Sequence, residues 1–478
     1  MTNVVSKNSG ATQVRLNLAT KLGLIILIGT LIMTGIIKKH LSNHRRNAFV
    51  TWAKHSAFKI ASLEMNQVEP QFLEELNKLI VGKRFIYLGE SDHFNNEKFA
   101  FRLTLIRHLF QLGWRNIAME IDYSTGQQID HYLESGDHKY LEFFYGQTPS
   151  AEDVACHGKH LEIIKEELRF VEQLRNISEL RSTDTGRLHY FGYDINFGSP
   201  DLAYETVRRL LEKQSSKACV QSLLKSLGKK QDETTEQEIS RLNTILKDLI
   251  TNQEEITNSF GEDTFCELKR SLLKLIDSVH AKTRARLTEN PREHYKWMAR
   301  REGAMFRHIT EFISKQPLGE KIIILGHNYH LCKDFTQLRG GPTLSHTWGW
   351  CGQAKGFGYS LHALIHRYSL DCQWGCTMGT FLNRMFPEEV VSIWMLYGQG
   401  HLMGLKNPIQ IRIKNDTIES LLAEVGENFL LPLHQCNKEA HILLEDANFR
   451  TTGGYYGSGN LPELTDAIFF VRTVSATQ

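Results

Sequence analysis

Short apolar runs recur along the chain, and four of them end in polar residues that can take part in chemistry. These runs occupy residues 85–88, 117–119, 188–191 and 322–325. Each is short and mostly apolar, as expected of a strand that is buried on both faces of a parallel sheet. Apolar residues at helical spacing indicate a helix over about 50–80 and another from Phe99 to about Gly113. The alternation of strands and helices predicts βαβ units.

The remaining pattern completes an α/β domain over residues 51–475. Long polar helices with few strand candidates predict a helical insertion over about 202–290. Residues 340–358 are rich in Gly, Trp and Ser and lack periodicity, which predicts a long loop. Apolar runs at 390–397 and 467–474 add two strands. The expected fold is α/β, with a mostly parallel central sheet flanked by helices.

Residues 22–37 form an uncharged apolar run that is flanked by lysines. As a helix it would measure about 24 Å, against roughly 30 Å for the hydrocarbon core, and the flanking lysines can extend outward to close the gap. We predict a single-pass transmembrane helix between a tail (1–21) and a basic linker (38–50). Cleavage as a signal peptide is disfavoured by the bulky, basic residues that follow. A buried core helix ranks last because nothing nearby would enclose it.

Charge and cysteine content narrow the possible partners. The chain has 56 basic and 54 acidic residues and no basic stripe, which argues against nucleic acid. A slight excess of basic residues after the apolar run favours a cytosolic soluble domain. The 8 cysteines are scattered, which suits a reducing compartment and small buried side chains. The expected membrane partner is a lipid bilayer, reached through residues 22–37.

The first strand leads into Glu90 and His93, which lie three residues apart in a turn before a helix. A carboxylate beside an imidazole raises the basicity of the ring and orients it, as activation of a water molecule requires. The alternative is structural, with Glu90 capping the helix and His93 as its partner. Because the carboxyl ends of parallel strands converge on one crevice, the polar residues at the other three strand ends favour a functional role.

The second strand ends with Glu120 and Asp122, which alternate onto the same face if the strand continues. Burying two carboxylates is costly, so they need an arginine, a histidine or a metal nearby. Arg102 lies on the following helix and can reach back across the strand ends; its alternative is an ordinary solvated arginine. Asp194 ends the third strand in the same way.

The fourth strand leads into His327, Asn328 and His330. Together with His93 and the two glutamates, these histidines could form a metal site. In a metal-free alternative, one histidine takes a proton from water while another, with an arginine, stabilises charge on a carbonyl oxygen. The residue types leave both accounts open. The chain lacks a Gly-x-Ser-x-Gly elbow and a phosphate-binding loop, which disfavours a serine α/β-hydrolase and a P-loop enzyme.

Several of these motifs, in this order, resemble the erythromycin esterase family. The resemblance runs from about Phe85 to Gly400. It rests on Gly89-Glu90-Ser91-Asp92-His93, Arg102, Gly113-Trp114, Ile117-Ala118-Met119-Glu120, Phe191-Gly192-Tyr193-Asp194, Arg301-Glu302, Gly326-His327-Asn328-Tyr329-His330 and Met378-Gly379.

The resemblance implies that His93 is the base that activates water and that Glu90 and Glu120 support it. Arg102, His327 and His330 would complete the catalytic pocket, and we assign Asp122, Asp194 and Asn328 to substrate binding. The family opens a lactone by hydrolysis, in general without a metal, so no cofactor is expected.

Haem-binding lipoproteins and metal-dependent proteases share this style of motif. The leading expectation is a membrane-anchored hydrolase that acts on a small-molecule ester or lactone. A non-catalytic protein that binds a divalent metal or haem, and a metal-dependent peptidase, remain alternatives.

Overall fold

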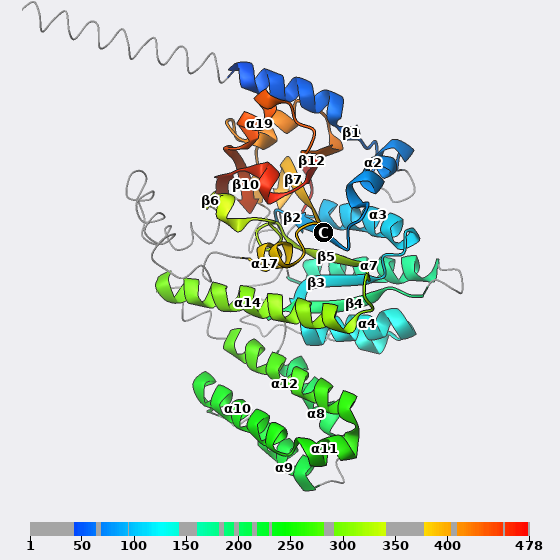
Figure 1. Cartoon of the computed structure of the whole chain (residues 1–478), viewed down its shortest axis with the longest axis vertical. Helices are drawn as coiled ribbons and strands as arrows, with labels where there is room; N and C mark the ends of the chain where they lie inside the picture. Colours follow the sequence, from blue (N-terminus) through cyan, green and yellow to red (C-terminus); the bar gives the residue numbers. More distant parts are fainter. Residues whose placement is uncertain are drawn as a thin grey trace, which may run out of the picture.

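The computed structural model describes residues 43–63, 68–93, 95–142, 160–180, 186–195, 200–212, 218–228, 232–281, 291–340, 377–402, 409–452 and 455–476. Helices flank a central sheet, and a further group of helices extends from one end of the molecule (Figure 1). The mixed α/β fold that the sequence predicts is therefore confirmed.

The main sheet has the strand order β1-β9-β12-β7-β2-β5-β3-β4, and β8 pairs with β7. Its strands are β1 (Phe58–Lys59), β2 (Phe85–Glu90), β3 (Asn116–Asp122), β4 (His189–Asp194), β5 (Ile322–His327), β7 (Val390–Leu402), β8 (Ile409–Ile411), β9 (Asn428–Pro432) and β12 (Ala467–Val474). From β12 to β4 every neighbouring pair is parallel, whereas β1, β8 and β9 make antiparallel pairs. The sheet is mostly parallel, as predicted, and each of the six apolar runs forms one of its strands.

Alternating side chains of β2 face two different cores. Ile86 and Leu88 pack in one core with the helices of one face, whereas Phe85 and Tyr87 pack in the other. The first face carries α2 (Pro70–Ile80), α3 (Glu97–Gln111), α4 (Tyr123–Ser135) and α7 (His160–Glu179), and the second carries α14 (Pro291–Lys315) and α17 (Met378–Met385). Burial on both faces explains why this strand is a continuous apolar run in the sequence.

The single helix predicted over about 50–80 is wrong. Residues 43–56 form a first helix, β1 follows, and α2 begins only at Pro70. Phe58 pairs with Leu430 of β9, so this part of the chain is drawn into the edge of the main sheet. Proline at the first turn suits the start of a helix but not its interior, which explains the new start at Pro70.

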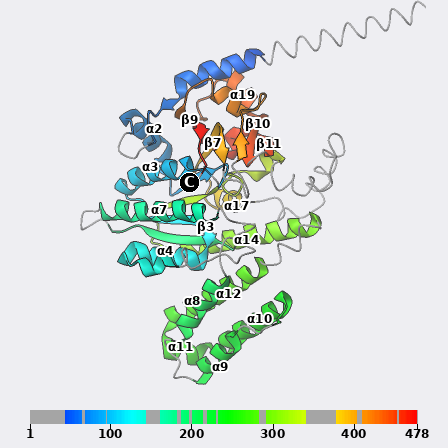
Figure 2. The same ribbon diagram turned by 180° about the vertical axis from the view of Figure 1, so that it is seen from behind.

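Helices form most of the region that the sequence assigns to an insertion. They are α8 (Pro200–Glu212), α9 (Ala218–Leu227), α10 (Thr235–Thr251), α11 (Gln253–Phe260) and α12 (Glu262–Ala281). They enclose an apolar core of their own, and Figures 1 and 2 show them as a separate layer beyond α4 and α14. α10 begins with a capping box in which Thr234 and Gln237 each bond the other's backbone N–H.

A second, antiparallel sheet lies in the C-terminal part of the chain with the order β10-β11-β6. Its strands are β6 (Leu338–Gly340), β10 (Ala447–Thr452) and β11 (Tyr455–Gly459). The short helices of the chain are η1 (His138–Leu141), η2 (Phe335–Gln337), α18 (Ile418–Leu422), α19 (Lys438–Leu444) and α20 (Leu461–Leu464). The loop predicted over 340–358 lies outside the described residues, apart from Gly340 at the end of β6.

The predicted anchor, residues 22–37, also lies outside the described residues. Within the described ranges, none of the helices combines the length and the apolar character that crossing a bilayer requires.

Candidate active site

The carboxyl ends of β2, β5, β3 and β4 lie side by side at one end of the sheet. Glu90 stands opposite His327 in the register of β2 and β5, and Asp122 stands opposite Asp194 in that of β3 and β4. The ends of these strands pack closely, because a Cβ atom placed on Gly326 of β5 would lie 2.5 Å from the hydroxyl of Tyr193 of β4. Strand register thus gathers the polar residues that are distant in the sequence.

Glu90 and His93 form a dyad at the end of β2. The distance between His93 Nδ1 and Glu90 Oε1 is 2.6 Å. The side chain of Glu90 is 2% exposed, whereas that of His93 is 33% exposed. With Nδ1–H donating to the carboxylate, Nε2 becomes the basic nitrogen of the ring. The dyad therefore combines a partly exposed basic nitrogen of His93 with the buried carboxylate of Glu90 that orients it.

Two buried cations hold Glu90 in its charged form. Arg102 Nη1 lies 3.0 Å and Lys98 Nζ 3.5 Å from Glu90 Oε2. Arg102 also donates to the carbonyl oxygens of Leu88 at 3.4 Å and of Gly326 at 3.2 Å, so it reaches back across the strand ends. Burial would raise the pKa of Glu90, but Arg102, Lys98 and the dyad partner together lower it well below its ordinary value.

His330 is enclosed between two carboxylates. Its Nδ1 bonds Glu302 of α14, and its Nε2 lies 3.3 Å from Glu120 Oε1. Burial and the nearby Arg301, whose Nη1 lies 3.2 Å from Nε2, oppose protonation of the ring. The two glutamates outweigh them and raise the pKa of His330 above its ordinary value. His330 therefore binds a proton more readily than an exposed histidine does.

Arg301 bridges two strand ends. Its Nε and Nη2 donate to the two oxygens of Asp194 at 2.9 and 2.7 Å, and Nη2 also donates to Glu120 Oε1 at 2.7 Å. Burial raises the pKa of Glu120, but His330 and Arg301 are the largest of the opposing effects, which lower it to about 2. Both carboxylates therefore have the partners that their burial requires.

His327 connects the two parts of the cluster. Its ring centroid lies 5.3 Å from that of His93 and 6.2 Å from that of His330. Its Nδ1 accepts from the Tyr329 N–H at 3.1 Å, which places its proton on Nε2, 3.2 Å from the Ser91 carbonyl oxygen. Burial, followed by His93, lowers the pKa of His327 to about 3, so the ring is neutral.

Asp122 and Asn328 are held by the protein itself. Asp122 Oδ1 caps α4 by accepting the N–H groups of Ser124 and Thr125 at 3.0 and 3.1 Å, and Asn328 Nδ2 donates to the Met395 carbonyl oxygen at 3.1 Å. A register shift between Met119 and Asp122 interrupts the alternation that would put Asp122 beside Glu120. Substrate contacts of both residues stay predictions.

All nine residues predicted for the site lie at these strand ends or in the helix and turns that follow them. The cluster also includes three charged residues that reasoning from individual residues did not place there: Lys98, Arg301 and Glu302. Arg301 precedes the buried Met305 and Ile309 by four and eight residues. A charge on the core face of an amphipathic helix is the signal that could have revealed Arg301.

The donor atoms of the cluster suit ion pairing better than metal coordination. Both ring nitrogens of His330 face carboxylates, and the guanidinium of Arg301 lies between Glu120 and Asp194 where a cation would otherwise bind. Within the described ranges, no three His, Cys, Asp or Glu side chains are grouped so that they could hold a metal ion.

Comparison with known proteins matches this chain to a protein family. A model of the erythromycin esterase family matches residues 110–474. An erythromycin esterase type II from Escherichia coli is 32% identical over 107 residues, which cover 20% of this chain and 24% of that protein. The match thus spans about a quarter of that relative's length. Glu90, His93 and Arg102 precede the range that the family model matches.

Solved structures share the fold. A protein from Bacillus cereus has a TM-score of 0.64 at 15% identity and covers 91% of this chain and 98% of its own. A succinoglycan biosynthesis protein has a TM-score of 0.62 at 16% identity, with the same coverage of 91% and 98%. An erythromycin esterase mutant in its open conformation has a TM-score of 0.57 at 18% identity and covers 87% and 97%. At such identities the likeness concerns the fold alone.

Proposed function

This chain belongs to the erythromycin esterase family, and we propose that it hydrolyses an ester or lactone with a water molecule activated by His93. The observation that carries the proposal is the contact of 2.6 Å between Glu90 and His93, with the carboxylate buried and the imidazole partly exposed. A base must reach both solvent water and the substrate, and His93 is the exposed imidazole of the cluster.

In the proposed reaction, His93 Nε2 removes a proton from water while the oxygen attacks the carbonyl carbon. The carbonyl π electrons move onto oxygen and form a tetrahedral oxyanion. When this collapses, the ester C–O bond breaks, and the imidazolium returns the proton to the leaving alkoxide. The products are a carboxylic acid, which then ionises, and an alcohol. Glu90 stabilises the imidazolium that forms in the first step.

The remaining charged groups of the cluster are paired with one another. Arg102 and Lys98 contact Glu90, Arg301 contacts Glu120 and Asp194, and His330 contacts Glu120 and Glu302. We assign stabilisation of the oxyanion to Arg301 and His330, because the guanidinium lies 3.2 Å from the His330 ring and the pKa of that ring is raised above its ordinary value.

The family points to a small-molecule substrate, and no step of this scheme passes through a metal. The test is a screen of purified protein against esters, lactones and amides, with and without a chelator. We expect hydrolysis of an ester or lactone that survives the chelator. His93→Ala should reduce it by about 100- to 10,000-fold, the range for a lost general base.

His108→Ala is the matched control, because His108 lies on α3 and bonds Asn77 at 2.7 Å, away from the cluster. It should leave turnover unchanged. Turnover that persists in His93→Ala would show that another group is the base. Peptide cleavage lost with the chelator would favour a metal-dependent peptidase, and a Soret band without turnover would favour haem binding.

We also propose that residues 22–37 anchor the protein in a bilayer, with the domain on the cytosolic side. The full chain should then sediment with membranes after a high-salt wash and dissolve in detergent. Leu27→Glu places a charge mid-segment at a cost of about 3 kcal/mol and should shift the protein toward the supernatant. Release by salt alone would contradict the anchor. Proteolysis of sealed vesicles would report the side on which the domain lies.

A further inference from the structure

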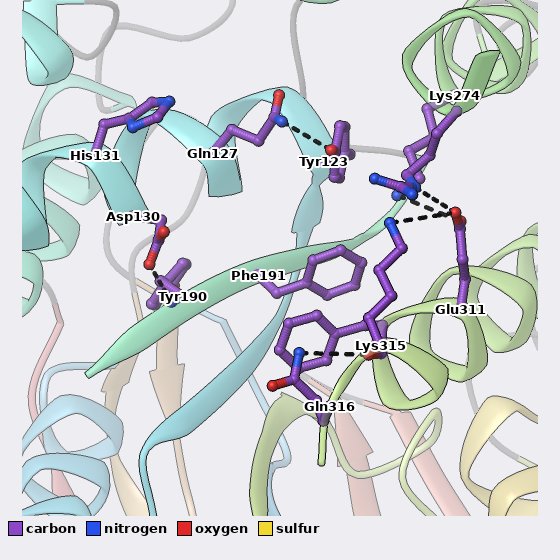
Figure 3. A pocket seen from close by; sticks show the side chains of 12 residues that line it. Tyr123, Gln127, Asp130, His131, Tyr190, Phe191, Lys274, Glu311, Lys315 and Gln316 are labelled. Carbon is purple, nitrogen blue, oxygen red and sulfur yellow. Dashed lines mark hydrogen bonds and ion pairs between the residues drawn. The ribbon is translucent and has the colours of Figure 1, made fainter. Parts of the chain in front are cut away.

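A polar pocket lies where the helical region meets the α/β domain. It has a volume of about 250 Å³ and is lined from α4, β4, α12 and α14. None of the active-site residues lines it. Figure 3 shows Lys274, Glu311 and Lys315 grouped on one side of the pocket and Asp130 and His131 on the other. Junctions between structural layers are common places for small-molecule sites.

Lys274 of α12 is the unusual residue of this pocket. Its side chain is 5% exposed, and Nζ has no hydrogen-bond partner among the described residues. The nearest carboxylate oxygen, Glu311 Oε2, lies 3.9 Å away. An ammonium carries three donors, so a buried one that makes no hydrogen bond leaves strong binding capacity unused.

Aromatic rings form the wall beside this ammonium. Nζ lies 3.5 Å from the ring centroid of Tyr123 and 4.9 Å from that of Phe191. Phe191 stacks on Phe312 with centroids 4.5 Å apart. These rings can cover the flat or apolar body of a ligand, while Nζ is left to bind a polar group at its end.

The carboxylates near Lys274 are engaged mainly with other basic groups. Glu311 is contacted by Arg270, Lys274 and Lys315, and Glu267 by Arg270, while Asp277 pairs with Arg307 and His308. On the far side, Asp130 is paired with Arg187 through both carboxylate oxygens at 2.7 and 2.9 Å. The ion pair of Lys274, at 3.9 Å, is the longest of those around Glu311, so Nζ has room for a closer anionic partner.

Burial is the largest influence on the Lys274 amine and lowers its pKa to about 7. The coulombic effect of Glu311 raises this pKa, that of Arg270 lowers it, and those of Glu267 and Asp277 raise it. A carboxylate beside Nζ would offset the cost of burying the ammonium.

We propose that this pocket binds a small monocarboxylate with a flat, apolar body, and that Lys274 is its anionic anchor. A carboxylate accepts several hydrogen bonds and carries the charge that an ammonium at the end of the pocket pairs with. The volume of 250 Å³ is below the roughly 300 Å³ at which typical drug-sized pockets begin, so the ligand is small. The site is separate from the proposed hydrolytic centre and does not depend on it.

The test measures binding of sodium benzoate to the full-length protein by titration calorimetry and by ligand-observed NMR. Benzamide keeps the shape without the charge, and benzylamine reverses the charge. We expect benzoate to bind and the other two to bind at least about tenfold more weakly. Lys274→Met should weaken benzoate binding by about 10- to 100-fold, as for a lost charge-assisted hydrogen bond.

Three further variants make the result decisive. Gln316→Trp fills the pocket without altering a buried charge and should abolish benzoate binding even if Lys274→Met folds poorly. Lys321→Met removes a lysine outside the pocket and should leave the affinity unchanged. His93→Ala should also retain it. Equal binding of benzamide, no binding of benzoate, or loss of binding in His93→Ala with retention in Gln316→Trp would each overturn the proposal.

Discussion

Two carboxylate–imidazole units lie in the same cluster, and they differ mainly in how they are enclosed. His93 rests on one carboxylate and is 33% exposed. His330 is 6% exposed and lies between Glu120 and Glu302, with Arg301 beside it. The same residue type can therefore serve two purposes: a partly exposed imidazole can exchange protons with water, whereas one enclosed by acids holds its proton more firmly and ties two carboxylates together.

Removing each imidazole in turn should affect the stability of the fold to different extents. His330→Ala leaves Glu120 and Glu302 buried without the imidazole that contacts both, so we expect the free energy of unfolding to fall by about 3–5 kcal/mol. His93→Ala leaves Glu90 paired with Arg102 and Lys98 and should cost about 1 kcal/mol or less. Urea unfolding of both variants measures the difference. Equal losses would contradict the distinction between the two units.

Lowering the pH should destabilise the fold through two buried residues of the cluster, His327 and Glu120. The unfolded chain protonates His327 near 6.5 and Glu120 near 4.5, whereas the folded pKa values are about 3 and about 2. The unfolded state therefore binds more protons over these ranges, and stability falls as pH drops from about 6.5 toward 3 and 2. Each group contributes up to about 1.4 kcal/mol per pH unit.

His327→Gln separates the two contributions. In this variant the free energy of unfolding should depend less on pH between about 6.5 and 4.5. Below about pH 4.5 it should still decrease with falling pH, because Glu120 is protonated there in the unfolded chain. The measurement is urea unfolding at a series of pH values. An unchanged slope between pH 6.5 and 4.5 would mean that folded His327 protonates as readily as an exposed histidine.

The smallest expected change in stability comes from Asp122. Burial raises the pKa of its carboxyl group, and hydrogen bonds from Ser124 and Thr125 lower it. Burial is the largest effect and raises its pKa to about 6, and Asp194 adds to it. The carboxyl therefore destabilises the fold as pH rises from about 4 through 6. Asp122→Asn keeps an oxygen to cap α4 and should raise stability at pH 8 by about 1 kcal/mol, with no gain at pH 4. Asp122→Ala, which also loses the cap, should lower stability at pH 4, and at pH 8 the lost cap should cancel the gain seen in Asp122→Asn.

The sheet could be predicted because its central strands are buried on both faces. Continuous apolar runs such as 322–325 leave few alternatives, and the strand assignment places Glu90, His93 and His327 at one end of the sheet. The segment around β1 could not be predicted, since Phe58 becomes part of a strand only by pairing with Leu430, which is distant in the sequence.

The partners of the charged groups were harder to predict than their positions. From the sequence, Glu120 needs an arginine such as Arg102, a histidine or a metal as its partner; in the structure, Arg301 and His330 contact Glu120, and Arg102 pairs with Glu90. Nothing in the spacing of residues shows which strand end an arginine on a long helix will reach. That depends on how α14 crosses the sheet.

The strands, the polar residues that end them and the family resemblance follow from the amino-acid sequence, because hydrophobic periodicity and local motifs are encoded over short distances. Which carboxylate meets which basic group, and which imidazole remains exposed, became known only from the folded chain. Pairing of charges depends on distances of about 3 Å between residues far apart in the chain, and packing alone sets those distances.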